Sequence, residues 1–258
     1  MLLNLSTVRG LFHRHSGHTL FLRLPQIRVQ SAFFRGSELL KTAVKNLLDE
    51  CLKRYPELSL CSNAVIEAFE AIRSCYAHGG KVLACGNGGS ASDAEHIVGE
   101  LMKKFSIKRV APQRLKDRLD ALGYSDSDKL CSMLEPALPA ISLVSQSSVL
   151  TAIANDTGAE MIFAQQVYGL GKPGDVLIAL STSGNSPNII SAIKIANALD
   201  MVTIGFTGET GGIMKSLCSV IVTVPSPVTF KIQELHLPVY HLLCAMIEEE
   251  FFGGTADK

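Results

Sequence analysis

The sequence predicts an α/β fold: a three-layer sandwich with a five-stranded parallel sheet of the flavodoxin-like kind, preceded by two helices. Short apolar stretches alternate with amphipathic helical patterns, and two of these stretches run into a loop rich in glycine or serine that a helix follows. This alternation is typical of parallel strands joined by right-handed crossovers, with helices on both faces. The chain has 258 residues, of which 47% are hydrophobic, enough for one full core. We therefore expect a single domain at residues 38–258.

The first part of this domain is expected to hold two helices and the first strand. Apolar side chains follow helical spacing at residues 38–54 and 61–79, and a glycine pair ends the second helix. A short apolar strand at residues 82–85 then runs into the glycine-rich loop 86–90, and a further helix follows. The order is strand, glycine-rich loop, helix.

A second unit of this kind spans residues 175–199. Residues 176–180 are a continuous apolar run, as in a strand that is buried on both faces. Ser186 is expected to cap the following helix, and Pro187 to be its first residue. The other strands are expected at residues 139–144, 201–206 and 219–224, and the other helices around residues 149–154, 159–170 and 231–252.

Residues 106–136 do not fit the alternation. They mix charged residues with Pro112, Gly123 and Pro136. We interpret them as an insertion with one short helix at residues 114–122. An insertion of this length is able to cover a site or to alter assembly.

Residues 1–37 differ in composition from the rest of the chain. They contain five arginines and three histidines but no acidic residue and no lysine, which leaves 19 basic and 24 acidic residues in the remainder. A segment of this kind, with Leu and Phe interspersed, has the composition of an organelle transit peptide. The alternatives are an untranslated upstream stretch, a cloning remnant or a plain disordered extension. We expect a segment that is either disordered or used for targeting.

The whole-chain composition excludes several partners. With 24 basic and 24 acidic residues the chain is neutral, so neither nucleic acid nor a membrane is expected as a partner. No apolar run reaches the roughly 18 residues that a spanning helix needs. The seven cysteines are scattered and odd in number, and we interpret them as buried small hydrophobic residues in a reducing compartment. The expected location is the cytoplasm, or an organelle if residues 1–37 are a transit peptide.

The loop S-T-S-G-N-S at residues 181–186 predicts a phosphate site. It lies between a buried strand and a helix N-terminus, so its hydroxyls and the free N–H groups of the first helical turn can converge on one dianion. It lacks the lysine of a nucleotide-binding P-loop and is not G-x-G-x-x-G, so a sugar phosphate suits it better than a nucleotide. The alternative is a polar turn with an ordinary serine cap.

The loop 86–90 repeats this design at the end of another strand. Its glycines let the backbone approach a ligand, and Ser90 with Asp93 can form an S-x-x-D capping arrangement. In open parallel sheets the ligand crevice lies beyond the carboxyl ends of the strands, which is where both loops fall. We therefore expect the two loops to face one ligand.

Four polar residues on two expected helices are candidates for a catalytic or metal site. His96 and Glu100 are four residues apart, so they lie on one face and can meet a common ligand or metal. Gln233 and His241 lie two turns apart on the last helix. The alternatives are a surface pair for His96 and Glu100, and a histidine satisfied within the apolar core for His241.

Pro238 should kink the last helix, because it removes one backbone donor and its ring clashes with the preceding turn. On a straight helix the Cα atoms of Gln233 and His241 would be roughly 12 Å apart. A bend would help both to reach one site, and without a bend the site has to lie between them.

Four motifs in this order resemble the phosphoheptose isomerase branch of the SIS (sugar isomerase) domain family. They are C-G-N-G-G-S-A-S-D-A-E-H-I-V-G-E at residues 85–100, A-N-D at 154–156, S-T-S-G-N-S at 181–186 and K-I-Q-E-L-H-L-P-V-Y-H at 231–241. The resemblance covers residues 38–252 apart from the insertion.

The resemblance implies the isomerisation of sedoheptulose 7-phosphate to D-glycero-D-manno-heptose 7-phosphate through an enediolate. Glu100 and His241 match the family's acid/base pair, and together with His96 and Gln233 they match its ligands for zinc, one ion per subunit. The resemblance also implies a homotetramer with active sites shared between subunits. The residues that match the family's substrate-binding set are Asn87, Gly88, Gly89, Glu100, Asn155, Asp156, Ser181, Thr182, Ser183, Ser186 and Gln233.

The residue types suit this chemistry. Moving a carbonyl by one carbon requires a base that removes the neighbouring proton and an acid that protonates the enediolate oxygen, and a carboxylate and an imidazole suit these tasks near neutral pH. Zinc held by two histidines, a glutamate and a glutamine could stabilise the enediolate or could only shape the site.

Two other functions stay open. One is a non-catalytic SIS protein resembling the family's replication-initiation regulator, although that branch lacks the helix glutamate that Glu100 supplies here. The other is a different isomerase, or a sugar-phosphate sensor that uses the same phosphate loop.

Overall fold

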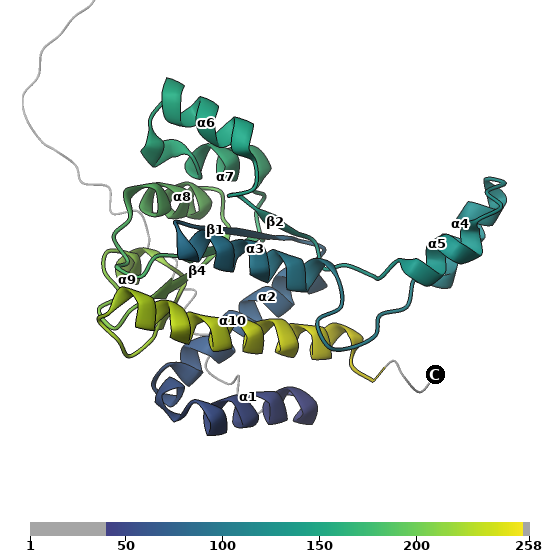
Figure 1. Ribbon diagram of the computed structural model, residues 1–258, viewed down its shortest axis with the longest axis horizontal. Helices are drawn as coiled ribbons and strands as arrows, with labels where there is room; N and C mark the ends of the chain where they lie inside the picture. Colours follow the sequence, from purple (N-terminus) through teal and green to yellow (C-terminus); the bar gives the residue numbers. More distant parts are fainter. Residues whose placement is uncertain (1–39, 255–258) are drawn as a thin grey trace, which may run out of the picture. The chain divides into compact units, whose positions relative to one another are not determined.

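The computed structural model describes residues 40–254, and five parallel strands of this part form one sheet between two layers of helices (Figure 1). The strand order is β2-β1-β3-β4-β5. The strands are β1 (Val82–Gly86), β2 (Ala140–Ser142), β3 (Val176–Leu180), β4 (Val202–Thr207) and β5 (Val220–Thr223). The predicted fold class is confirmed. The expected basic extension, residues 1–37, lies outside the described residues.

Alternate side chains of each central strand enter two separate cores. Val82 and Ala84 of β1 pack in one core, whereas Leu83 and Cys85 pack in the other, and all four are fully buried. β1 pairs with β2 on one side and with β3 on the other, with Val82 opposite both Ala140 and Val176. A strand in this position is covered on both faces, which explains its unbroken apolar sequence.

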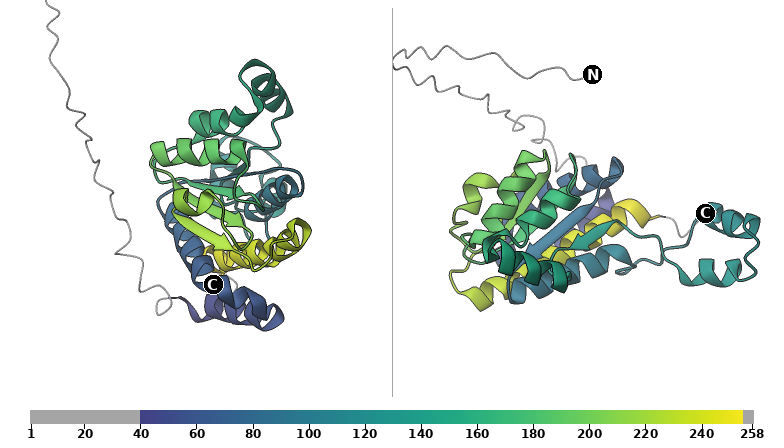
Figure 2. Two further views of the ribbon diagram at one scale, coloured as in Figure 1. Left: turned by 90° about the vertical axis from the view of Figure 1, so that its left-hand side faces the viewer. Right: turned by 90° about the horizontal axis from the view of Figure 1, so that it is seen from above.

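One face of the sheet is covered by the helices that carry most of the candidate catalytic residues (Figure 2). They are α2 (Ser62–Ala77), α3 (Gly89–Met102) and α10 (Thr229–Phe252), and they share the larger core with α1 (Thr42–Arg54) and the 3₁₀ turn η3 (Pro56–Cys61). Lys41, just before α1, forms an ion pair of 3.2 Å with Glu250 near the end of α10. The two helices expected before the first strand are thus present.

The other face is covered by α7 (Ala164–Leu170) and α8 (Pro187–Ala198), together with α6 (Ser147–Asp156), η4 (Ala159–Met161) and α9 (Met214–Leu217). The single helix expected at residues 159–170 is wrong, because the chain forms η4 and α7 with a turn between them. Phe163, at this turn, is 2% exposed and packs in the core. Burial of this side chain, and not helix propensity, therefore determines the backbone conformation here.

The last helix is not interrupted by its proline. α10 runs through Pro238 as one helix of 24 residues (Figure 1). Pro238 is buried, as are Val239 and Tyr240 beside it. Packing along the whole buried face therefore maintains the helix where the proline removes one hydrogen bond.

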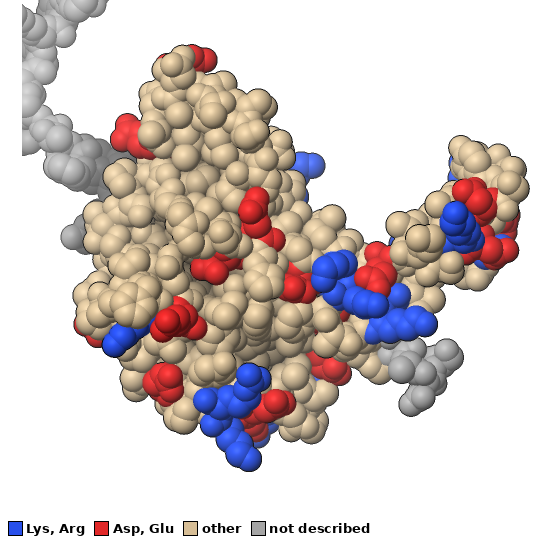
Figure 3. All heavy atoms as spheres, in the orientation of Figure 1, with Lys and Arg blue, Asp and Glu red and all other residues tan. Residues whose placement is uncertain are grey.

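The insertion contains two helices, and the expectation of one is wrong. α4 (Gln113–Ala121) and α5 (Ser127–Met133) form a hairpin in which Lys116 bridges Asp120 at 2.9 Å and Asp128 at 3.1 Å. The hairpin carries charges of both signs (Figure 3). It follows the C-terminal end of α3, the opposite end of that helix from the loop 86–90 (Figure 1). Within one chain it therefore does not cover this loop.

A buried ion pair holds the base of the insertion against α10. Glu248 and Arg109 meet at 3.0 Å, and each side chain is only 1% exposed. Glu248 also accepts hydrogen bonds from the backbone N–H groups of Phe105, Ser106 and Ile107 at 2.7 to 3.0 Å. Burial alone would raise the pKa of Glu248, but these hydrogen bonds outweigh it, so the pKa is lowered. The carboxylate is thus stabilised in its charged form.

Arg109 extends this buried cluster to the end of α3. Its guanidinium donates to the backbone oxygens of Leu101 at 3.0 Å, Pro136 at 3.0 Å and Glu100 at 3.3 Å. These oxygens belong to the last turn of α3 and to the chain that returns from the hairpin. The Arg109–Glu248 pair therefore joins α3, α10 and both ends of the insertion.

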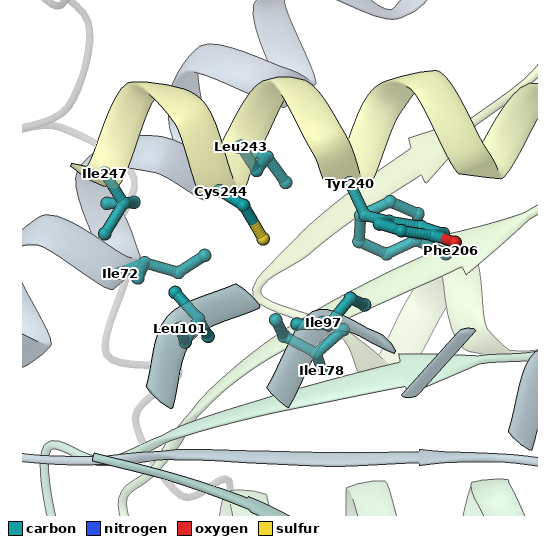
Figure 4. A pocket seen from close by; sticks show the side chains of 9 residues that line it. All are labelled: Ile72, Ile97, Leu101, Ile178, Phe206, Tyr240, Leu243, Cys244 and Ile247. Carbon is teal, nitrogen blue, oxygen red and sulfur yellow. The ribbon is translucent and has the colours of Figure 1, made fainter. Parts of the chain in front are cut away.

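A small cavity lies within the larger core between α2, α3, α10 and the sheet (Figure 4). Its lining is apolar and includes Ile72, Ile97, Tyr240 and Cys244. The cavity of about 10 Å³ has room for at most one water molecule. It is therefore a packing defect and not a site for a polar sugar phosphate. Along the whole described stretch, no helix is both long and apolar enough to span a bilayer.

Candidate active site

The two candidate loops lie side by side because they follow neighbouring strands. β1 and β3 are paired along their whole length, and Gly86 lies opposite Leu180 where they end. Asn87 and Asn188 exchange two amide hydrogen bonds of 2.9 and 2.8 Å, which tie the loop after β1 to the first turn of α8. The expectation that both loops meet at one edge of the sheet is confirmed by this contact.

In the loop 181–186, two serine hydroxyls converge on each other. The Oγ atoms of Ser181 and Ser186 are 2.9 Å apart, and Ser181 is buried. Ser186 occupies the N-cap position of α8 and Pro187 the first helical position, as expected, but the Ser186 hydroxyl makes no capping hydrogen bond. In the first turn of α8, it is instead the Oδ1 atom of Asn188 that accepts a backbone N–H, that of Ile189, at 3.0 Å. The Ser186 hydroxyl is therefore directed into the loop.

The conformation of the loop 181–186 depends on Gly184, which packs closely against the segment that follows β4. Gly184 has a φ of +66°, and a Cβ there would lie 2.2 Å from the backbone oxygen of Gly211. Asn185 Oδ1 accepts the N–H of Ile213 at 2.9 Å, and Gly208 donates its N–H to the oxygen of Thr182. The segment after β4 thus holds the serine loop in place.

The loop 86–90 begins α3 without the expected serine cap. Gly88, with a φ of +56°, is the N-cap residue, and Ser90 is already inside the helix and buried. The predicted Ser90–Asp93 capping arrangement is therefore wrong. Asp93 Oδ1 instead accepts a hydrogen bond from the hydroxyl of Tyr240 at 3.2 Å. The packing of α10 on α3 therefore gives Asp93 a hydrogen-bond partner other than the helix N-terminus that the sequence pattern predicted.

Three of the four candidate polar residues come together between α3 and α10. His96 Nε2 lies 3.1 Å from Glu100 Oε1 on the same helix and 3.5 Å from His241 Nε2 on α10. Tyr240 contacts the other nitrogen of His96, with its hydroxyl 3.0 Å from Nδ1. A carboxylate and two imidazoles thus share one cluster, which has the groups needed for proton transfer.

The cluster is bounded by residues of the chain that leads into the insertion. The ring of Phe105 lies 5.6 Å from that of His241, and Lys103 Nζ lies 3.5 Å from Glu100 Oε2. Burial and the neighbouring His96 lower the pKa of His241, while Glu100 opposes this shift. His241 is therefore favoured in its neutral form, which can accept a proton or bind a metal.

Gln233 lies two turns earlier on α10, against the start of α3. A Cβ added at Gly89 would lie 2.6 Å from Gln233 Nε2, so this glycine makes room for the amide. Between Gln233 and His241, His236 is completely buried and donates its Nε2–H to the oxygen of Thr207 at 3.2 Å. Burial lowers the pKa of His236 to about 4. His236 is thus a neutral residue of the core, whereas His241 belongs to the cluster between α3 and α10.

Asn155 and Asp156 lie apart from these groups. They end α6, are exposed, and contact each other through a hydrogen bond of 2.8 Å. No residue of α6 is buried. Within one chain the structure does not bring this pair to the two loops or to the histidine cluster.

The side chains of this cluster offer the kinds of ligand atom that zinc binds, although these atoms are not arranged around a single point. In residues 40–254, no group of three or more His, Cys, Asp or Glu side chains is already arranged to hold a metal ion. However, the distances of 3.1 and 3.5 Å from His96 Nε2 to its two neighbours are close to those between zinc ligands, roughly 3.3–3.6 Å in a tetrahedral site. Nitrogen and carboxylate oxygen are also ligands that zinc accepts.

Several site residues were not predicted from the sequence. Asn188 connects the two loops, Tyr240 contacts both His96 and Asp93, and Phe105 lies against His241. Asp93 is three residues before His96, so helical spacing could have placed both on one face. Tyr240 and Phe105 had no such signal, because their roles depend on how α10 packs on α3.

Comparison with known proteins agrees with this geometry. The SIS domain model matches residues 49–130 and 125–208. A phosphoheptose isomerase of Desulfovibrio desulfuricans is 42% identical over 185 residues, which cover 72% of this chain and 76% of the relative. A phosphoheptose isomerase of Burkholderia pseudomallei is 39% identical over 226 residues, which cover 88% of this chain and 90% of the relative.

Solved structures show the same similarity. A phosphoheptose isomerase from Francisella tularensis matches with a TM-score of 0.63 at 32% identity, and one from Neisseria gonorrhoeae with a TM-score of 0.61 at 33% identity. Each match covers 80% of this chain and 97% of the solved chain. By fold, sequence and site motifs, the chain belongs to the SIS domain family, in its phosphoheptose isomerase branch.

Proposed function

We propose that this protein is a sugar-phosphate aldose–ketose isomerase that converts sedoheptulose 7-phosphate to D-glycero-D-manno-heptose 7-phosphate. The observation that carries the proposal is the contact of His96 with both Glu100 and His241, on the helix that begins at the loop 86–90. The relatives named phosphoheptose isomerase support the choice of substrate.

The phosphate would bind at the serine loop. Ser181 and Ser186 present two hydroxyls at the N-terminus of α8, where the helix dipole favours an anion. Thr182 and Ser183 belong to the same loop. Asn87, Gly88 and Gly89, which the Asn87–Asn188 contact holds next to this loop, would bind the sugar hydroxyls.

Glu100 and His241 would transfer the protons. One removes the proton from the carbon next to the carbonyl, and the other protonates the oxygen of the enediolate. The carboxylate of Glu100 is the better candidate for the base, and His241, on the facing helix, for the acid, through the one N–H that its neutral imidazole keeps. The phosphate loop lies on another segment, so phosphate binding and proton transfer use separate residues.

Zinc is proposed as the cofactor, at one ion per subunit. His96, Glu100 and His241 would hold it, with Gln233, two turns before His241 on α10, as the fourth ligand. When bound, the ion would act as a Lewis acid that favours negative charge on the substrate oxygens.

We further propose a homotetramer in the cytoplasm. In such an assembly, the exposed pair Asn155 and Asp156 would reach the site of a neighbouring subunit, which is consistent with the lack of buried residues in α6. The alternative location is an organelle, if residues 1–37 act as a transit peptide.

A panel of ketose phosphates tests the function. We expect the pure protein to form an aldose phosphate from sedoheptulose 7-phosphate at a higher kcat/KM than from pentulose or hexulose phosphates. Turnover of another ketose alone would identify a different isomerase. If no ketose is converted but one binds, the protein is a sensor or a non-catalytic regulator, and the proposal is wrong.

The phosphate loop has a test of its own. Ser183→Ala combined with Ser186→Ala should weaken sugar-phosphate binding at least about tenfold, because hydrogen bonds to a charged group contribute about 1.5–3 kcal/mol each. Calorimetric titration of the folded variant measures this. As a control, Ser62→Ala removes a serine at the start of α2, where its hydroxyl bonds only the oxygen of Ser59. Equal affinity in the double variant and the wild type would contradict the phosphate assignment.

A further inference from the structure

A chain of three hydrogen-bonded side chains lies behind the proposed metal and proton-transfer site. It runs from Asp93 through Tyr240 to His96, with distances of 3.2 Å from Tyr240 Oη to Asp93 Oδ1 and 3.0 Å from Tyr240 Oη to His96 Nδ1. Tyr240 is 2% exposed, and Asp93 Oδ2 is buried with no hydrogen-bond partner. Tyr240 and the Asp93 carboxylate oxygen Oδ2 thus lie within the protein, on the side of His96 away from Glu100.

The direction of these hydrogen bonds follows from the donors available. A tyrosine hydroxyl has one hydrogen, and a carboxylate can only accept. The hydrogen of Tyr240 therefore goes to Asp93, and the oxygen of Tyr240 accepts from His96 Nδ1–H. In a neutral imidazole with its hydrogen on Nδ1, Nε2 carries a lone pair.

The lone pair on His96 Nε2 points at the carboxylate of Glu100, which has no hydrogen to donate. His96 Nε2 lies 3.1 Å from the carboxylate oxygen Oε1 of Glu100, and two acceptors at this distance repel each other unless a positive charge lies between them. A divalent cation removes the repulsion and uses both lone pairs. His241 Nε2, 3.5 Å from His96 Nε2, is placed to join them.

We propose that Asp93 and Tyr240 are positioning residues that fix the tautomer of His96 and present its Nε2 lone pair to a divalent cation. The proposal rests on the proposed function for the identification of this cluster as the active site. The direction of the hydrogen bonds does not depend on the proposed function. Histidine ligands commonly donate their second N–H to a carboxylate or a carbonyl, and here the carboxylate acts through a tyrosine hydroxyl.

The experiment compares Tyr240→Phe with the wild-type protein in competition with a chromophoric zinc chelator. Tyr240→Phe keeps the ring in the core and removes only the hydroxyl, so the zinc affinity should fall about 10- to 100-fold, the usual cost of losing an outer partner of a ligand. The matched control is Tyr76→Phe, which removes a buried hydroxyl that bonds the oxygen of Pro139 in the same core. The control should bind zinc within about twofold of the wild type.

A second measurement separates this inference from the proposed cofactor. Nitrogen-15 NMR of labelled histidines in the zinc-free protein, at a pH about two units above the ordinary histidine pKa of about 6.5, reports which nitrogen of His96 carries the hydrogen. We expect Nδ1–H in the wild type. Asp93→Asn should shift the hydrogen to Nε2, because its amide can donate to Tyr240 and turn the hydroxyl toward His96.

The outcomes are distinct. Unchanged zinc affinity in Tyr240→Phe, or a wild-type His96 with its hydrogen on Nε2, overturns the inference. If the wild type binds no zinc but the NMR result is as expected, the Asp93–Tyr240 pair sets the tautomer and the cofactor proposal alone fails.

Discussion

Glu100→Gln is expected to lower kcat at least about a hundredfold while substrate binding changes far less. General acid/base groups typically contribute 10² to 10⁴ in rate, and a carboxamide of the same shape cannot remove a proton. His241→Ala should give a loss of similar size. The phosphate-binding residues lie on other segments, which explains why affinity should be retained. Steady-state kinetics together with calorimetric binding of the substrate measure both effects.

Solvent exchange separates the loss of the base from the loss of the metal. The wild type should transfer deuterium from D₂O to the carbon next to the carbonyl, and Glu100→Gln should not. Zinc content is measured in each variant, because Glu100 and His241 are also proposed ligands. Glu95→Gln is the matched control on the same helix, since Glu95 is exposed and bonds Ser145 at 2.9 Å away from the cluster. Exchange at the wild-type rate in Glu100→Gln would show that this carboxylate is not the base.

Glu248→Gln should lower the free energy of unfolding by about 3–5 kcal/mol. The change leaves the guanidinium of Arg109, 1% exposed, without its counter-charge, and breaking one side of a buried pair has a cost of this order. Urea unfolding followed by circular dichroism at fixed protein concentration measures the effect. Glu250→Gln, on the same helix, removes an ion pair with the half-exposed Lys41 and should cost less than about 1 kcal/mol.

A double variant gives a sharper test of this cluster. Buried ion pairs can often be replaced by apolar residues without loss of stability. Here Arg109→Met with Glu248→Leu should stay destabilised, because the N–H groups of Phe105, Ser106 and Ile107 would lose their acceptor. Recovery of wild-type stability in the double variant would mean that the loop does not depend on the Glu248 carboxylate.

The order of strands and helices could be predicted because each signal is local. The apolar run of β3 and the glycine-rich end of β1 each specify a buried strand followed by a turn, whatever lies around them. His96 and Glu100 could be paired for the same reason, since residues four apart share one face of a helix. These features depend on backbone geometry over a few residues.

Other features were decided only by the tertiary structure. The hydroxyl of Ser186 bonds Ser181 and not the helix N-terminus, because the loop after β4 folds the serine loop back on itself. Asp93 bonds Tyr240 and not the start of its own helix, because α10 packs on α3. Side-chain hydrogen bonds are short-ranged, so their partners are settled by whichever segment packs nearest.

The sequence by itself thus determined the fold class, the two loops at neighbouring strand ends and the residue types of the site. The tertiary structure decided which groups meet: His241 with His96, Phe105 with His241, and Glu248 with Arg109 and the base of the insertion. The physical reason is the separation along the chain. His96 and His241 are 145 residues apart, and no local periodicity can specify a contact that depends on how two helices pack on one sheet.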